Sequence, residues 1–384
     1  MMKRVRLLIL SWLVVGAMYG AEGSYGVGDR NGAGDSNGVG DSVKVVKPKF
    51  LYDVDFLTYF DNREYKKVYQ EPQTIFGFRL SPEIGLGIVE RNGVSHKLMA
   101  GVSYLQPLGG NWKDVKLSAT AYYQLRYKGI TMNLGAVPYK YFIRQLPDFM
   151  RYDSVAYYHP NIQGALMQYE SKWGFVEFMC DWWGMQRVDQ REMFRLTVDG
   201  EFRYTGLFRY MIGGVAQMGH KANKKSPSPR EGVADDIYVS PNISIDFAPA
   251  IPLDTLCLRA SYIYGLQQFR HHEKHQPQGL MLEFMIRWKM LGAKNTFYYG
   301  DNLMPLYGLF GCDLNQGDPF YQAKLYNRTD IYVYLYNNSF INCYFSWNMH
   351  YIRESGLQHQ QQLILLFSLD GLKKAERLRG LFDK

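Results

Sequence analysis

The chain has 384 residues and a formal net charge of +8 at pH 7, and it is rich in aromatic residues, with 31 Tyr, 22 Phe and 7 Trp. Loss of an N-terminal segment with Lys3, Arg4 and Arg6 lowers the charge to about +5, and the remaining charges are spread along the chain. So small and dispersed a charge, with no basic patch beside base-stacking residues, argues against nucleic acid as a partner.

Residues 1–21 are predicted to be a secretory signal peptide. A basic start is followed by an apolar core from Leu7 to Val15 and then by the small residues Ala17 and Ala21, which is the order typical of such peptides. No later stretch approaches the roughly 20 apolar residues that a membrane-spanning helix needs. The mature chain is therefore expected to contain no transmembrane helix.

Residues 22–48 are predicted to be a disordered leader. Between Gly26 and Asp41 a Gly/Asp-rich unit repeats every six residues, and such a segment has nothing to bury. Asp29, Asp35 and Asp41 leave a calcium-binding repeat as the alternative, but the nine-residue period of that motif is missing.

Period-two alternation bounded by turn residues then predicts a series of strands. Their spans are 49–62, 74–90, 94–106, 113–128, 129–137, 160–171, 173–183, 194–205, 206–220, 235–249, 254–270, 278–290, 293–300, 325–336, 339–353 and 357–370.

The connections between these strands are alternately short and mostly long. Asn92-Gly93, Lys128-Gly129 and Asn337-Asn338 favour tight hairpins, whereas the segments from Val137 to His159 and from Asp301 to Lys324 are long. This rhythm predicts an all-β fold, a transmembrane antiparallel up-and-down barrel of about 16 strands over residues 49–370, with 14 or 18 strands as alternatives.

The strands of a secreted β-sandwich would also alternate between polar and apolar residues, so two further observations decide between the folds. Many segments exceed the roughly 5–6 residues usual in soluble strands. Aromatic residues such as Trp112, Trp173 and Trp182 lie toward the segment ends, where the interfacial girdles of a membrane barrel require them. We therefore expect a barrel in the cell outer membrane, with the N-terminus and a basic tail (371–384) in the periplasm and the long loops outside.

The segment from Lys49 to Asp370 as a whole resembles a bacterial outer-membrane porin-type barrel. Ile130 to Pro138, the long loop after it and Asn161 to Gly164 resemble the strand, inward loop and strand of phosphate-selective porins. The resemblance implies a homotrimer, outer-membrane lipid and the outer-membrane insertion machinery as partners, and small hydrophilic solutes as cargo. Phosphate selectivity is not carried over, because no ladder of arginines lines one wall.

Charged residues on the predicted inward faces would line the pore, or would pair across strands and brace the wall. They are Arg79, Lys97, Lys116, Arg126, Arg195, Arg203, Arg209, Arg259, Arg287 and Arg328, against Asp53, Asp55, Glu83, Glu177, Asp181, Asp199, Glu201, Asp246, Glu283 and Asp330.

The loop from Tyr139 to His159 has two interpretations, a constriction folded into the lumen or a lid packed on the outer rim. Its many aromatic residues favour burial in either case. The charged residues that a constriction would present are Lys140, Arg144, Asp148, Arg151 and Asp153.

Metal sites are weakly indicated, and no cofactor is expected. The Gly-Asp pairs between Asp301 and Tyr321 are turn formers before they are calcium ligands, and the cluster from His271 to His275 lacks the one-face geometry of a helical zinc site. The four cysteines have no paired short spacing, and Cys180, Cys257 and Cys343 point outward in the predicted register.

Passive diffusion of small hydrophilic solutes is the function that this barrel predicts, because about 16 strands enclose enough width for water. A plugged barrel that anchors or assembles a surface polymer or a protein complex is the alternative. An outer-membrane lipid or peptide hydrolase is the third hypothesis. We expect no enzyme, because no Gly-x-Ser-x-Gly occurs and no Ser or Asp lies near a histidine within one loop.

Overall fold

A computed structural model describes residues 48–225, 227 and 231–370. The predicted signal peptide, the leader up to residue 47 and the basic tail lie outside these residues. The strands are β1 (Lys49–Glu64), β2 (Gln73–Val89), β3 (Ser95–Pro107), β4 (Lys116–Tyr127), β5 (Ile130–Pro138), β6 (Asn161–Ser171), β7 (Gly174–Gly184), β8 (Met193–Thr205), β9 (Arg209–Lys221), β10 (Ala234–Asp246), β11 (Thr255–Phe269), β12 (Glu273–His275), β13 (Gln278–Trp288), β14 (Leu291–Gly300), β15 (Leu325–Asn337), β16 (Ile341–Ile352) and β17 (Gly356–Asp370).

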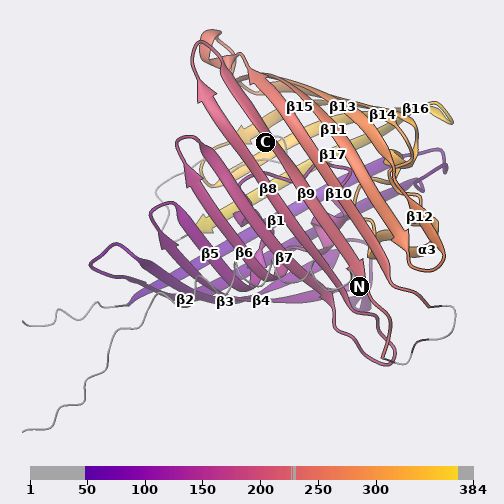
Figure 1. Ribbon diagram of the computed structural model, residues 1–384. Helices are drawn as coiled ribbons and strands as arrows, with labels where there is room; N and C mark the ends of the chain where they lie inside the picture. The colour runs from indigo at the N-terminus through magenta and orange to yellow at the C-terminus, as the bar shows by residue number, and fades with distance from the viewer. Residues whose placement is uncertain (1–47, 226, 228–230, 371–384) are drawn as a thin grey trace, which may run out of the picture. The chain divides into compact units, whose positions relative to one another are not determined.

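The strands form one closed antiparallel barrel (Figure 1). Each wall strand pairs with its neighbours in sequence, and β1 pairs with β17 to close the sheet. The three-residue β12 pairs only with the end of β11, and Gln276 and Pro277 separate it from β13. The wall thus has 16 strands, and the predicted all-β barrel of about 16 strands is confirmed.

Short helical turns occur only in the connections of the described chain. They are η1 (Trp112–Asp114), η2 (Tyr139–Tyr141), α2 (Asp153–Tyr158), η3 (Ala248–Ala250), α3 (Tyr307–Phe310), η4 (Gly311–Asp313) and η5 (Pro319–Gln322). None of the helices in the described residues has the length and apolar character needed to cross a bilayer.

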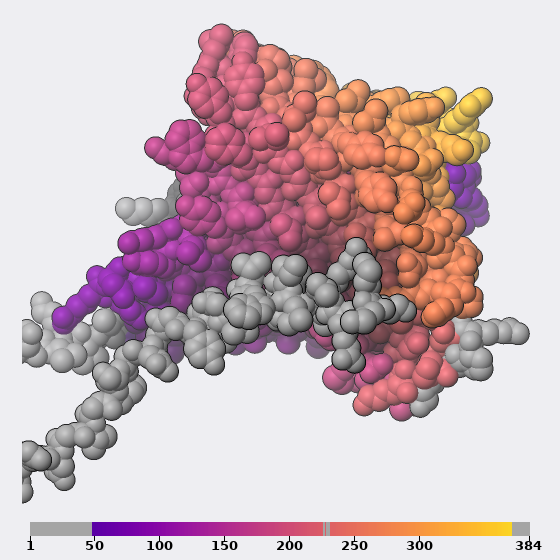
Figure 2. Space-filling view, in the orientation of Figure 1, coloured from indigo at the N-terminus to yellow at the C-terminus, as the bar shows by residue number. Residues whose placement is uncertain are grey.

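Alternation along each strand gives the wall a polar inner face and an apolar outer face. On β8, Arg195, Thr197 and Asp199 are buried, whereas Val198 and Phe202 are 46% and 52% exposed. Successive side chains of a strand point to opposite faces, so the exposed apolar set covers the outside. Figure 2 shows that the side chains of the middle strands form a continuous outer surface.

The connections distinguish the two ends of the barrel. The short-turn end carries segments such as 128–129, 172–173 and 206–208, and the long-loop end carries 139–160, 222–233 and 301–324. The 128–129 hairpin needs positive φ at both central residues, as a type I′ turn does, and Lys128 and Gly129 have φ values of 45° and 82°.

One orientation predicted from the sequence is wrong. Cys257 points into the barrel, where it is 4% exposed, because it lies on the same face of β11 as the inward Arg259 and Ser261. The local sequence Leu256-Cys257-Leu258 is apolar at three successive positions, so it carries no period-two signal from which the face could be read. The four cysteines are free thiols.

Labelling of Cys312 tests which end of the barrel faces the cell exterior. Cys312 in η4 is exposed at the long-loop end, whereas the other three thiols are buried or partly buried in the wall. If the long loops face outward, a membrane-impermeant maleimide labels intact cells, and Cys312→Ser removes the label while Cys343→Ser retains it. Labelling that requires disrupted cells would put the short-turn end outside.

Candidate functional site

The loop of residues 139–159 crosses the interior of the barrel. Lys140 Nζ lies 2.6 Å from Asp53 on β1, Arg144 pairs with Asp199 and Glu201 on β8, and Asp148 lies 3.5 Å from Lys294 on β14. Since these three strands stand at separate positions around the wall, the loop spans the lumen. Its action as the constriction of a channel stays a prediction.

Of the three charged anchors of this loop, Arg144 has the least exposed side chain. Its guanidinium bonds Asp199 and lies 2.9 Å from Glu201, and it stacks over the ring of Phe175. The side chains of Arg144 and Asp199 are only 10% and 1% exposed. A planar guanidinium between two buried carboxylates holds its position by several charge-assisted bonds.

The second long loop, 301–324, also folds inward. Lys221 pairs with Asp313, and the carbonyl of Leu314 accepts from Arg195. Asp318 caps η5 and accepts from Gln70 and Tyr326, and burial raises the pKa of Asp318 to about 6 although Arg328 opposes the shift. Apolar residues of both loops pack with inward wall residues into one core: Leu146, Phe149, Met150, Leu303, Met304, Phe320, Tyr321, Tyr238, Ile263, Met281, Tyr298, Tyr326 and Ile352.

The charged residues predicted to line a pore lie on the inner face, and most contact a loop or each other. Contacts to the loops are made by Arg79 (carbonyls of Ala156 and Tyr157), Lys97 (Tyr141), Lys116 (Tyr158 ring), Glu177 (amides of Ile143 and Arg144), Asp181 (Tyr139) and Arg195. Contacts within the wall and its short turns join Arg203 to Glu201, Arg209 to Asp246, Arg259 to Glu283, Arg287 to Asp254 and Arg328 to Asp330.

The remaining predicted residues fall in three places. On the inner wall, Asp55 pairs with Lys140, and Glu83 accepts from the hydroxyl of Tyr122 at 3.2 Å. Arg126 is exposed at the short-turn end of β4. Within the loop, Arg151 lies 3.7 Å over the ring of Tyr139, and Asp153 lies 3.8 Å from Arg328 and accepts from Gln362. Whether any of these residues borders a path for solutes stays a prediction.

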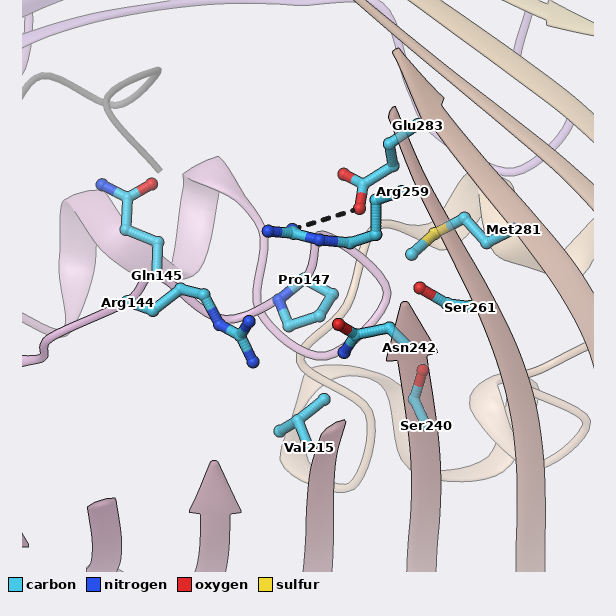
Figure 3. A pocket seen from close by; sticks show the side chains of 10 residues that line it. All are labelled: Arg144, Gln145, Pro147, Val215, Ser240, Asn242, Arg259, Ser261, Met281 and Glu283. Carbon is cyan, nitrogen blue, oxygen red and sulfur yellow. Dashed lines mark hydrogen bonds and ion pairs between the residues drawn. The ribbon is translucent and has the colours of Figure 1, made fainter. Parts of the chain in front are cut away.

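A small cavity lies between the 139–159 loop and the inner faces of β9 to β13 (Figure 3). Its lining includes Arg144, Pro147, Asn242, Arg259 and Glu283, and its volume is about 20 Å³. One water molecule needs about 10–15 Å³ of such space. The cavity is therefore too small for an organic substrate, and a catalytic site must be sought elsewhere.

The eight histidines of the chain differ in what their ring nitrogens contact. His96 uses both nitrogens, toward Tyr123 and Glu90, and His350 is 1% exposed between Tyr326 and Gln360. His275 and His220 each pair with one carboxylate through one nitrogen, His275 with Glu273 at 3.0 Å and His220 Nδ1 with Asp235 Oδ1 at 2.6 Å. The His275 pair is exposed to solvent, whereas the His220 pair is mostly buried, and no other described residue bonds His220 Nε2. A histidine held by a carboxylate with its second nitrogen unengaged has the arrangement of a general base.

This pair, His220 and Asp235, is called the rim dyad because it lies on the outer face at the long-loop end. Lys221 and Asp236, the next residues along β9 and β10, are buried inside, so His220 and Asp235 point outward. Arg270 donates to the second oxygen of Asp235 at 3.0 Å. The side chains of His220 and Asp235 are 19% and 13% exposed, so the pair is accessible without being free to rotate in solvent.

Aromatic rings fix the level of the rim dyad relative to a bilayer. Phe194 packs 4.9 Å from the His220 ring, and Trp182 stacks on Phe194 at 5.2 Å. Trp182 is 43% exposed on the outer face. Exposed Trp at the end of an apolar belt marks the membrane interface, so the dyad lies near the boundary between lipid head groups and acyl chains.

A second polar cluster lies outward at the same end, over β16, β17, β1 and β2. Thr74 donates its hydroxyl to Asn62 at 2.8 Å, and Asn62 donates to Gln361 at 2.7 Å. His359 accepts from Trp347 at 3.3 Å. No described carboxylate bonds to His359, so this cluster has a hydroxyl and an imidazole but lacks the fixed base of the rim dyad.

Sequence inspection missed the rim dyad because its members belong to adjacent strands rather than to one loop. His220 is the next-to-last residue of β9, and Asp235, 15 residues later, is the second residue of β10. The sequence pattern that could have revealed the pair is a His just before a long connection and an Asp just after it. The groups from His271 to His275 and around Asp301, Asp313 and Asp318 do not assemble three metal-ligating side chains within the described part of the chain.

Comparisons with known proteins give a family and a fold. A family model described as Lipid A 3'-O-deacylase-type matches residues 44–370. A search of curated proteins gives no match. Pseudomonas aeruginosa OpdK, solved with vanillate, is similar over 84% of this chain and 98% of its own, with a TM-score of 0.50 and 11% identity. Pseudomonas aeruginosa OccK2 (OpdF) covers the same shares with a TM-score of 0.49 and 10% identity.

These findings confirm one expectation and overturn another. The porin-type outer-membrane barrel expected from the sequence is confirmed by the fold and by its similarity to OpdK. The expectation that the chain is not an enzyme is wrong, because the matching family is described by an enzymatic activity. The missing sequence motif was a poor guide, since catalytic partners meet across strands without a local signature.

Replacement of Arg144 tests how firmly the loop is held in the lumen. Arg144→Ala leaves the buried Asp199 without its cation, and removal of one partner of a buried pair costs about 3–5 kcal/mol. We expect a loss of this size in the free energy of unfolding, measured by urea titration of tryptophan fluorescence in lipid vesicles.

Arg209→Ala is the matched control, because the Arg209 side chain is 44% exposed in its pair with Asp246. Such a pair contributes about 0–1 kcal/mol. Equal losses for the two variants would contradict a buried anchor at Arg144.

Proposed function

The chain belongs to the lipid A 3'-O-deacylase-type family, and from this membership we propose that it hydrolyses an ester bond between a lipid A sugar and an acyl chain. The observation that supports a particular catalytic site is the rim dyad. Its histidine is oriented by a carboxylate, faces outward and lies at the level where the ester groups of membrane lipids are found.

The rim dyad supplies the proton transfers that ester hydrolysis needs. With Nδ1–H donated to Asp235, the lone pair of His220 Nε2 can take a proton from a water molecule. The water oxygen then bonds to the acyl carbonyl carbon, and the carbon–oxygen bond to the sugar breaks. His220 returns the proton to the sugar oxygen, so the products are a free fatty acid and a sugar hydroxyl.

Asp235 and Arg270 are positioning residues in this proposal. Asp235 holds the imidazole tautomer and stabilises the imidazolium that forms during the reaction. Arg270, which bonds the other oxygen of Asp235, keeps that carboxylate aimed at His220. The lipid would approach from the bilayer side, since both long loops occupy the lumen.

The His220→Ala variant tests the proposed base. Loss of a general base typically lowers a rate by 10²–10⁴-fold, so we expect deacylation of lipid A to fall by about that factor. The assay is mass spectrometry of lipid A incubated with purified protein in mixed micelles. Asp235→Asn should also lower the rate while leaving the fold, checked by heat-modifiable electrophoretic migration, unchanged.

His359→Ala is the matched control, because His359 lies at the same end of the barrel but forms no hydrogen bond or ion pair with a carboxylate of the described residues. Its rate should equal that of the wild type. Full activity of His220→Ala with loss in His359→Ala would move the site to the cluster of Thr74, Asn62 and Gln361. Full activity in both variants would reject histidine catalysis.

Passive diffusion of small hydrophilic solutes is the second candidate function, favoured by the porin-type fold. The charges of the 139–159 loop and of the inner wall would form its constriction, with opposite signs on facing sides. A homotrimer and assembly by the outer-membrane insertion machinery belong to the same proposal.

Conductance in a planar bilayer tests this candidate. Wild-type protein should give small steps, because the loop is anchored on opposite sides of the lumen. Arg144→Ala combined with Asp148→Ala removes two of the three anchors of the loop, leaving Lys140 in place, and should enlarge the steps. Equal conductance in the two proteins would show that the loop does not limit diffusion, and no conductance in either would leave the hydrolase as the remaining function.

A further inference from the structure

The outer wall carries an apolar groove that is separate from the rim dyad. It crosses five strands, β9, β10, β11, β13 and β14, and has a volume of about 610 Å³. Its lining residues are Ile212, Gly213, Pro241, Asn242, Ile243, Ala260, Ser261, Tyr262, Leu280, Leu282, Phe297 and Tyr299.

Register explains why a groove forms here. One row of successive cross-strand partners runs across the five strands: Gly213, Asn242, Ser261, Met281 and Tyr298. None of these residues places a side chain on the outer face. The groove runs along this row. Its two banks are the outward residues on either side, such as Tyr262, Leu280 and Tyr299 on one bank and Ile243, Leu282 and Phe297 on the other.

Small residues deepen the groove where larger ones would fill it. In the second bank, the small Ala260 leaves a gap between larger side chains. In the first bank, Gly214 and Pro241 are cross-strand partners at the end formed by β9 and β10. A side chain at Gly214 would meet the backbone of Pro241 at 3.0 Å. Pro241 also lacks the N–H that would bond β11, and the register of β10 with β11 is interrupted there.

The groove has the length and direction of a lipid tail. Adjacent strands lie about 4.8 Å apart, so five strands give a length of roughly 19 Å, and one leaflet of the hydrocarbon core is roughly 15 Å deep. Gly213 lies in the middle of β9, whereas Tyr298 is close to the end of β14. The groove therefore rises from the middle of the barrel to the long-loop end.

Polar groups occur at the end of the groove that lies near the long loops. Tyr262 donates its hydroxyl to the side-chain oxygen of Gln278 at 2.5 Å, and the backbone N–H of Gln278 donates to the Asp301 carboxylate at 3.1 Å. Elsewhere the outward banks are hydrocarbon and aromatic. A long apolar track with polar groups at one end is complementary to an amphiphile, with its tail along the track and its head at Gln278.

We propose that this groove binds one acyl chain of an outer-membrane lipid lengthwise, with the lipid head group beside Gln278 and Asp301. Its occupant is held by shape complementarity and van der Waals contact, because an acyl chain already in the bilayer gains no hydrophobic free energy by moving onto the wall. The polar end lies on β13 and β14, away from His220 on β9. The site is therefore a binding site in its own right, and it does not depend on the proposed hydrolysis.

Photo-crosslinking tests the groove directly. Purified protein in detergent is mixed with an equimolar phosphatidylethanolamine that carries a diazirine in the middle of one acyl chain, and adducts are mapped by mass spectrometry. We expect adducts to concentrate on Tyr262, Leu282 and Phe297. Ala260→Phe, which fills the groove, should lower these adducts about tenfold because most of the contact with the acyl chain is lost.

Ala121→Phe makes the same change at an exposed outward position of β4 and should leave the adducts unchanged. Adducts spread over the outer wall in proportion to exposed area, or unaffected by Ala260→Phe, would overturn the proposal. So would a dimer that Ala260→Phe dissociates, seen by native mass spectrometry in place of lipid adducts. His220→Ala should keep the adducts, so failure of the hydrolase proposal and failure of this one are distinguishable.

Discussion

Pairing of β1 with β17 is the contact on which the rest of the structure depends. In the hydrocarbon core no water can bond a free backbone N–H or C=O, so a sheet that crosses a membrane must have no edge. The register from Asp53 opposite Asp370 to Glu64 opposite His359 joins the first strand to the last. Only after this closure do an inside and an outside exist, and the loop anchors and the rim dyad lie on opposite faces of the wall.

In the closed barrel, neighbouring residues of one strand face opposite sides of the wall and have different roles. Asp236 faces inward and accepts from Gln267 and Asn315, whereas its neighbour Asp235 faces outward and holds His220. The inner face gathers paired charges that anchor the two long loops. The outer face is mainly apolar, and the rim dyad and the cluster of Thr74, Asn62 and Gln361 interrupt it near the interface. Polar groups that break an apolar surface are usually there for function.

The porin-type architecture and the deacylase-type family are compatible because a fold does not imply a function. A 16-strand wall is wide enough for a channel, but here two inward loops with a shared apolar core fold into the lumen. The same wall offers its outer face to lipid. A lipid-modifying activity needs only that outer face, so it can be added without changing how the barrel is built.

The sequence alone determined the fold class, the strands and the turns, because these depend on local patterns. The alternation along β8 and the residues Lys128 and Gly129 carry their signal within a few positions. Where the local pattern is uniform, as at Cys257, the inward or outward face could not be read. The path of the 139–159 loop, the meeting of His220 with Asp235 and the groove beside Ala260 were decided only by the tertiary structure, because each depends on residues from different strands, and their separation in space is set by register and closure rather than by distance along the chain.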